Sequence, residues 1–348
     1  MYKQLIYLLF SIMLLTSCEE YYTPKIDALG DQLVVDALIT NNVSKNYVRL
    51  TKTLGFYDQQ APPPAVGATV QLVDKKGVVF DGTETGTGSF IFGAIPAIGN
   101  SYKLRIKYQN NTYESEMITM PPLPTNFNVY CGGKAKTTYS PDAFGAIMTV
   151  NIPGSEIYMD VPATDALAYY RFNTRSIIEW VYNAPGGPPP PPVFGWVSYT
   201  ETDNFNIAGP KAFSQSDTIK KHPIVWLADD SRYYLFSDTL VSQGWILIVD
   251  QFGTSQRSYE FHEKMNSQFS ADGTLFDPIQ TQIIGNITCK TDHSKIVYGY
   301  FDLNSYQQFR YFMKPAPHLD GNLRQILSYP YISNEGQATP YHPEWWED

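Results

Sequence analysis

Residues 101–108 read Ser-Tyr-Lys-Leu-Arg-Ile-Lys-Tyr, and apolar or aromatic side chains alternate with basic ones along most of this stretch. Because successive side chains of a β-strand point to opposite faces, Tyr102, Leu104 and Ile106 would share one face and the basic residues the other. One buried face and one solvated face are typical of a strand in an antiparallel sheet. The stretch therefore predicts a strand and indicates an antiparallel β fold.

Similar patterns surround this strand on both sides. Short apolar or alternating segments, separated by turn residues, predict further strands at residues 33–40, 47–54, 68–73, 77–80 and 89–92. About seven short strands at this spacing are typical of an immunoglobulin-like β-sandwich. We predict this sandwich over residues 28–120, followed by a proline-rich linker at 120–124 that cannot continue a central strand.

The remainder of the chain is also rich in strand patterns but less regular. We predict buried strands at residues 244–249 and 295–301. Phe261, Met265 and Phe269 recur at helical spacing, which predicts one short helix over residues 258–269. The expected fold class is thus all-β dominated, with the N-terminal sandwich followed by a larger irregular β-rich domain at residues 125–348.

The first residues have the features of an export signal. Lys3 precedes an apolar stretch that is shorter than the about 20 residues needed to span a bilayer, so residues 1–17 are predicted to be a signal peptide. The following Leu15-Thr16-Ser17-Cys18 resembles the bacterial lipobox, in which the cysteine is acylated and becomes the mature N-terminus. We expect lipidation of Cys18 and a tether at residues 18–27; the alternative is a general secretory signal with an unrelated cysteine.

Composition excludes two classes of protein. The chain has 25 Lys+Arg against 34 Asp+Glu and a formal net charge of -9, so it has no basic excess for nucleic acid, which we do not expect as a partner. Aromatic residues make up 15%, which excludes global disorder. Aromatic rings suit core packing, sugar stacking and protein interfaces alike.

Two aromatic or proline-rich segments are candidate partner contacts. Trp345 and Trp346 lie at the C-terminal end, and chain termini are usually exposed. The proline run at 188–192, which includes Pro190, lies between aromatic residues and is expected to form an extended arm. The alternative for this run is a surface insertion without a partner.

We find no sequence pattern for catalysis. The chain has no Gly-x-Ser-x-Gly elbow and no phosphate-binding loop, and His262-Glu263 lacks the second histidine of a zinc protease. We therefore expect no catalytic residues, no metal and no cofactor. Cys131 and Cys289 remain after Cys18, and in an exported protein they would be either a disulfide or two buried thiols.

The segments described so far, together with later ones, resemble an uncharacterised family of Bacteroidota outer-membrane lipoproteins. The resembling blocks, in chain order, are residues 33–40, 47–51, 66–70, 96–102, 120–122, 259–269, 273–278, 285–287 and 297–301. Genes of this family commonly lie beside SusC-type TonB-dependent receptors. The resemblance implies anchoring in the outer membrane and an accessory role in uptake or assembly.

The resemblance also bears on where the chain is displayed. Glu19 and Glu20 directly after the lipidated cysteine resemble surface-export signals of such lipoproteins, with an ordinary solvated tether as the alternative. Thr218 and Thr239 follow aspartate and precede an apolar residue, as in O-glycosylation sites of these bacteria. Both features are consistent with exposure at the cell surface.

We therefore expect a non-enzymatic outer-membrane lipoprotein that is an accessory binding or interaction subunit of a TonB-dependent uptake system. The alternative is a free-standing surface lipoprotein that binds a glycan or a peptide. A hydrolase whose carboxylates the sequence does not identify is the least favoured hypothesis.

Overall fold

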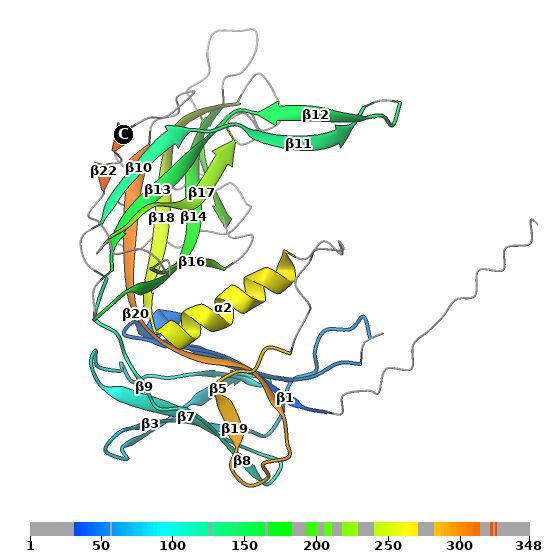
Figure 1. Ribbon diagram of the computed structural model, residues 1–348, viewed down its shortest axis with the longest axis vertical. Helices are drawn as coiled ribbons and strands as arrows, with labels where there is room; N and C mark the ends of the chain where they lie inside the picture. The colour runs from blue at the N-terminus through cyan, green and yellow to red at the C-terminus, as the bar shows by residue number, and fades with distance from the viewer. Residues whose placement is uncertain are drawn as a thin grey trace, which may run out of the picture.

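The computed structural model describes residues 31–55, 58–124, 127–142, 144–163, 166–182, 193–200, 205–210, 218–228, 240–270, 282–313, 321–322 and 324–325. Within them the chain is mostly β-strand, as predicted, with the α-helix α2 (Gln256–Phe269) and the 3-10 helix η1 (Val43–Lys45). The strands form three main sheets and a hairpin (Figure 1).

The long sheet has ten strands and extends through the whole molecule. Its main path is β15 (Val193–Thr200), β14 (Tyr169–Tyr182), β18 (Leu240–Thr254), β20 (Val297–Met313), β1 (Leu33–Thr40), β2 (Tyr47–Lys52), β6 (Ser89–Ile91) and β5 (Thr83–Gly86). Two short strands pair off this path, β16 (Asn206–Ala208) with β14 and β22 (Arg324–Gln325) with β20.

Two smaller sheets and a hairpin complete the fold. The sandwich sheet consists of β19 (Ile287–Cys289), β8 (Asn111–Ser115), β7 (Ser101–Tyr108), β3 (Thr69–Asp74) and β4 (Val79–Asp81), with β9 (Ile118–Thr119) beside β7. The upper sheet consists of β17 (Thr218–Ala228), β13 (Gly154–Pro162), β10 (Asn128–Gly133) and β21 (Gly321–Asn322). The hairpin pairs β11 (Lys136–Pro141) with β12 (Ile147–Ile152).

One face of the long sheet buries two hydrophobic cores. Phe301 and Leu303 of β20 pack into the core beneath the sandwich sheet, and Phe309 and Tyr311 pack into the core beneath the upper sheet. All four are odd-numbered, so they share one face of the strand. β20 thus runs from one core to the other, as Figure 1 shows.

The division into residues 28–120 and 125–348 needs correction. β20 pairs in parallel with β1, and β19 pairs with β8, so two strands from the C-terminal half complete the N-terminal sandwich. The strands predicted at 33–40 and 101–108 are present with the same bounds. Sandwich architecture is confirmed, but it is assembled from both ends of the described chain.

The helix is present, but its predicted apolar stripe does not mark its buried side. Ser255 caps the N-terminus by accepting a hydrogen bond from the Ser258 amide. The buried side chains are Ser258 and His262, whereas Phe269 is 60% exposed. The helix therefore packs through these buried polar residues and through the half-buried Phe261, whose ring stacks on Tyr300 with centroids 4.5 Å apart.

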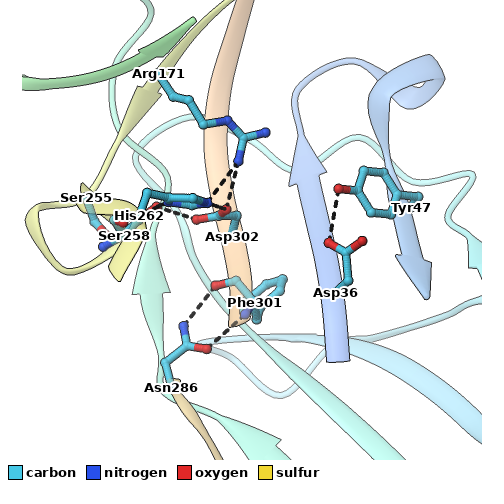
Figure 2. Close-up of polar contacts among 9 residues, drawn as sticks. All are labelled: Asp36, Tyr47, Arg171, Ser255, Ser258, His262, Asn286, Phe301 and Asp302. Carbon is cyan, nitrogen blue, oxygen red and sulfur yellow. Dashed lines mark hydrogen bonds and ion pairs between the residues drawn. The ribbon is translucent and has the colours of Figure 1, made fainter. Parts of the chain in front are cut away.

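The start of β20 depends on two glycines in close contact with other backbone. Gly299 has φ 88°, and a Cβ there would lie 1.9 Å from the carbonyl oxygen of Val35 in β1. A Cβ on Gly285 would lie 1.7 Å from the carbonyl oxygen of Gly299. Beside them, the Asn286 side chain makes two hydrogen bonds to the backbone of Phe301, at 2.8 and 2.9 Å (Figure 2). No side chain fits between β1 and β20 at this point.

Gly299→Ala should destabilise the protein strongly, because a methyl group adds a backbone clash to the strain of a positive φ. We expect a loss of about 3 kcal/mol or more in the free energy of unfolding, measured by urea denaturation. Gly77→Ala is the control, since Gly77 has φ 87° but open space around its Cβ position. Its loss should be about 1 kcal/mol. Equal losses for the two variants would contradict close packing of β20 on β1.

Candidate functional site

The face of the long sheet opposite the two cores carries charged and polar side chains, and we call it the polar face. Gln308 of β20 pairs in register with Asp250 of β18, and both Arg310 of β20 and Arg175 of β14 pair with Ile248 of β18. Its charged and hydrogen-bonding side chains include Arg171, Arg175, Asp250, Asp302, Tyr306, Gln308 and Arg310. Five of them belong to two hydrogen-bonded groups along the sheet, and the other two, Arg175 and Arg310, line a cavity beside the second group.

The first group joins the helix to the sheet. Arg171 of β14 donates a hydrogen bond to Asp302 of β20 at 3.2 Å, and Ser258 of α2 donates a short hydrogen bond to the other carboxylate oxygen (Figure 2). Arg171 Nη1 also lies 3.3 Å from His262 Nε2. All four side chains are at least nine-tenths buried. The group is a buried ion pair between Arg171 and Asp302, and α2 supplies further hydrogen-bond partners to both charges.

His262 is held in its neutral form. Its Nδ1 lies 2.8 Å from the carbonyl oxygen of Ser258, which can only accept, so Nδ1 carries the proton and Nε2 accepts from Arg171. Burial and the nearby guanidinium lower the pKa of His262, although the Asp302 carboxylate acts in the opposite direction. A neutral imidazole here receives a hydrogen bond instead of adding a third buried charge.

The group contains serine, histidine and aspartate, but its geometry is not that of a hydrolase triad. In a triad the histidine lies between the other two and accepts the serine proton. Here Ser258 donates directly to Asp302, and the His262 atom nearest the serine hydroxyl is the protonated Nδ1, at 3.5 Å. The chemistry that this arrangement supports is structural attachment of α2.

The second group surrounds Asp250 of β18. Its carboxylate binds Lys45 of η1 at 2.5 Å, the Tyr306 hydroxyl at 2.6 Å and the Gln308 amide at 2.8 Å. Burial alone would raise the pKa of Asp250, but Lys45 and these hydrogen bonds hold it below its ordinary value. The carboxylate is therefore charged and fully engaged.

A cavity of about 810 Å³ opens beside this second group. Residues 41–45 around η1 form one wall, and Arg175, Tyr306, Gln308 and Arg310 of the polar face form the other. Small-molecule sites in proteins have volumes of about 300–1,000 Å³. The second group therefore forms part of the wall of a space that could hold a ligand.

Both remaining cysteines are buried thiols. Cys131 in β10 belongs to the core under the upper sheet, and Cys289 in β19 belongs to the core of the sandwich. Because they lie in different cores, they do not form the disulfide that was one of the two alternatives. Cys289 instead contacts the side chains of Asn111 and Thr291.

The other residues singled out from the sequence are only partly described. Thr218 begins β17 opposite Pro162 and is partly buried. Cys18, Pro190, Thr239, Trp345 and Trp346 lie outside the described residues, as do the signal peptide and the tether. Glycosylation, lipidation and those contacts therefore stay predictions.

Sequence reasoning missed both polar groups. Arg171, Asp250 and Asp302 each interrupt an apolar strand, in Tyr-Tyr-Arg-Phe, Ile-Val-Asp-Gln and Tyr-Phe-Asp-Leu. Charged residues are almost never fully buried unless they are paired, so this interruption is the signal that could have located them. The partners come from distant segments, which the local pattern does not reveal.

Among the residues that the structure describes, no three His, Cys, Asp or Glu side chains gather closely enough to hold a metal ion. The helices in the same part of the chain fall short of the length and apolarity that crossing a membrane requires.

Comparison with known proteins identifies one match. The model of a family described as Domain of unknown function (DUF4249) matches residues 19–310. No curated protein and no solved structure matches the chain. The match extends over the sandwich, the upper sheet except β21, α2 and most of β20.

Asp302→Asn should cost about 3–5 kcal/mol of unfolding free energy, because it leaves the buried Arg171 charge without a counter-charge. Thermal and urea unfolding measure this loss. Asp36→Asn, an exposed aspartate on the same face of the neighbouring strand β1, should cost less than about 1 kcal/mol.

A double variant checks the reason for the loss. Arg171→Met combined with Asp302→Leu removes both charges and should recover most of the stability lost in Asp302→Asn. If Asp302→Asn is as stable as Asp36→Asn, the pair does not anchor the helix.

Proposed function

Because this chain belongs to the DUF4249 family, whose function is unknown, we propose that it is a non-enzymatic lipoprotein of the outer membrane. In this proposal Cys18 carries the lipid anchor, and the protein is an accessory binding subunit of a SusC-type TonB-dependent receptor. The signal peptide and lipobox support the anchor, and the resemblance described above supports the receptor. The observation that carries the interaction role is the hairpin β11–β12.

The hairpin extends beyond the upper sheet and pairs with no other described strand (Figure 1). Its apolar side chains are exposed: Tyr139 is 73%, Phe144 at the turn 96% and Ile147 76% accessible. The pairing of Pro141 with Ile147 places Tyr139 and Ile147 on one face, and Met148 and Val150 on the other. Both faces of the hairpin thus expose apolar groups.

Such a hairpin is typical of an interaction surface. An isolated two-stranded hairpin is marginally stable in water, so this length of strand needs further contacts to stay ordered. Exposed apolar patches mark protein or membrane interfaces, and unpaired strand edges can pair with another chain. A hairpin with both features fits a partner that covers its faces or adds a strand to its edge.

A shared membrane would strengthen such a contact. A lipid on Cys18 confines the protein to the surface in which the receptor is embedded, which raises their effective concentration. The tether at residues 18–27 would let the folded part reach a neighbour, because an extended chain spans about 3.3 Å per residue. Trp345, Trp346 and Pro190 remain further candidate contacts.

The alternative function is a free-standing surface protein that binds a glycan or a peptide. The cavity beside Asp250 is the specific observation that favours it. The two functions differ in whether the receptor is needed for the protein to act.

Substituting the hairpin tests the receptor proposal. Phe144→Ser with Ile147→Ser should reduce co-purification of the receptor from gently solubilised outer membranes by about tenfold, because anchor residues dominate interface energy. Val78→Ser is the matched control, since Val78 is 50% exposed in the turn between β3 and β4. Quantitative mass spectrometry of the captured proteins provides the readout.

Lipidation is tested in the same strain. Cys18→Ala should leave the protein unprocessed or release it from the membrane fraction. Retention of a cleaved form would contradict the anchor. If the receptor is absent from the wild-type capture, or if uptake by the receptor is unchanged after deletion of the protein, the accessory role is wrong.

A further inference from the structure

The cavity beside Asp250 has a cationic wall. Its charged lining residues, as far as the structure describes them, are Lys45, Arg175 and Arg310, and no described carboxylate lines it. Asp250 lies behind this wall and neutralises Lys45. The positive charge of the cavity wall therefore comes mainly from Arg175 and Arg310, although the whole protein has a formal net charge of -9.

Arg175 and Arg310 lie side by side on the polar face. Both pair in register with Ile248 of the strand between them, so their backbones are two strand spacings apart, about 10 Å. Burial lowers the pKa of Arg310, and the charge of Arg175 lowers it further. Arg310 Nη2 donates a hydrogen bond to Gln308 Oε1 at 2.5 Å, so Arg310 is held beside the cavity by a neutral partner. Two like charges facing one space repel each other unless an anion lies between them.

Arg175 differs from Arg171, which occupies the same face of the same strand. Arg171 has Asp302 as its partner, whereas Arg175 has neither a hydrogen bond nor an ion pair with any described residue. The Nε atoms of both arginines are buried without an acceptor, so the difference between them lies in the terminal nitrogens of the guanidinium, which have the Asp302 partner only in Arg171. A ligand that offers acceptor oxygens to Arg175 would satisfy donors that the described residues leave unpaired.

We propose that this cavity is a binding site for a small organic oxyanion, held by the guanidinium groups of Arg175 and Arg310. Guanidinium forks match the oxygens of carboxylate, sulfate and phosphate groups, which are the shared chemistry of the expected ligand. The cavity is large enough for an organic molecule to carry that group, and Ile95, 62% exposed at its edge, offers an apolar contact. The site does not depend on receptor binding.

Binding of sugar acids tests the proposal directly. The mature full-length protein in detergent would be titrated calorimetrically, at low salt, with glucuronate, glucose 6-sulfate, glucose 6-phosphate and neutral glucose. We expect saturable binding of at least one anion and none of glucose. The three anions distinguish carboxylate from sulfate and phosphate.

Variants assign the binding to the two arginines. Arg175→Gln should weaken the anion by about tenfold or more, as expected for loss of a charge-assisted hydrogen bond. Arg49→Gln is the control, because Arg49 is exposed on β2 and its loss changes the net charge equally. Arg175→Lys keeps the charge without the fork and should bind with intermediate affinity.

Thermal unfolding separates binding from folding. Because Arg175 has a like charge as its neighbour, Arg175→Gln should unfold at an equal or higher temperature than the wild type. The bound anion should raise the unfolding temperature of the wild type more than that of the variant. Absence of saturable binding for all three anions, or equal weakening by Arg49→Gln, would overturn the site. Neither result bears on whether the receptor co-purifies.

Discussion

The parallel pairing of β1 with β20 is the constraint on which the rest of the structure depends. Eight residue pairs, from Leu33 with Val297 to Thr40 with Asn304, join segments from opposite ends of the described chain. Parallel strands cannot be joined by a tight turn, so a long connection must link β1 to β20. That connection contains β14, β18, α2 and the strands β10, β13 and β17 of the upper sheet. Because β20 continues past β1 to pair with β18, one sheet serves two cores.

This shared sheet leaves one face uncovered by either core, and the charged residues of the strands gather there. Each buried charge on that face needs a counter-charge, and Arg171 and Asp250 have theirs in Asp302 and Lys45. Arg175 has none among the described residues. The same physical rule therefore separates residues that hold the fold together from a residue placed to bind a ligand. The hairpin β11–β12 is a second, independent surface, defined by exposed apolar groups instead of unpaired charge.

Much of the fold followed from local sequence pattern. Residues 101–108 alternate in step with burial, and residues 33–40 form a run of β-branched and apolar residues, so local pattern located both strands with their bounds. The position of the helix followed from its spacing, but its most buried face did not. The fully buried side chains of α2 are Ser258 and His262, whereas Phe261 of the predicted stripe is half-buried against Tyr300. Pairing of β19 and β20 with the N-terminal sandwich could not be predicted, since local pattern carries no information on partners that are about 170 residues away for β19 and about 260 for β20. For the same reason the two polar groups could not be predicted as groups, although their charged residues interrupt apolar strands, because their members come from five elements: η1, β14, β18, α2 and β20.

Because they are paired along their shared length, β1 and β20 should form one cooperative unit that joins the two cores. Native-state hydrogen exchange of the full chain, followed by mass spectrometry, tests it most directly. Amides of residues 33–40, 297–304 and 305–313 should exchange together and belong to the slowest class. Fast exchange at 297–304 while 33–40 stays protected would show that the sandwich folds without the returning strand, and would contradict the account.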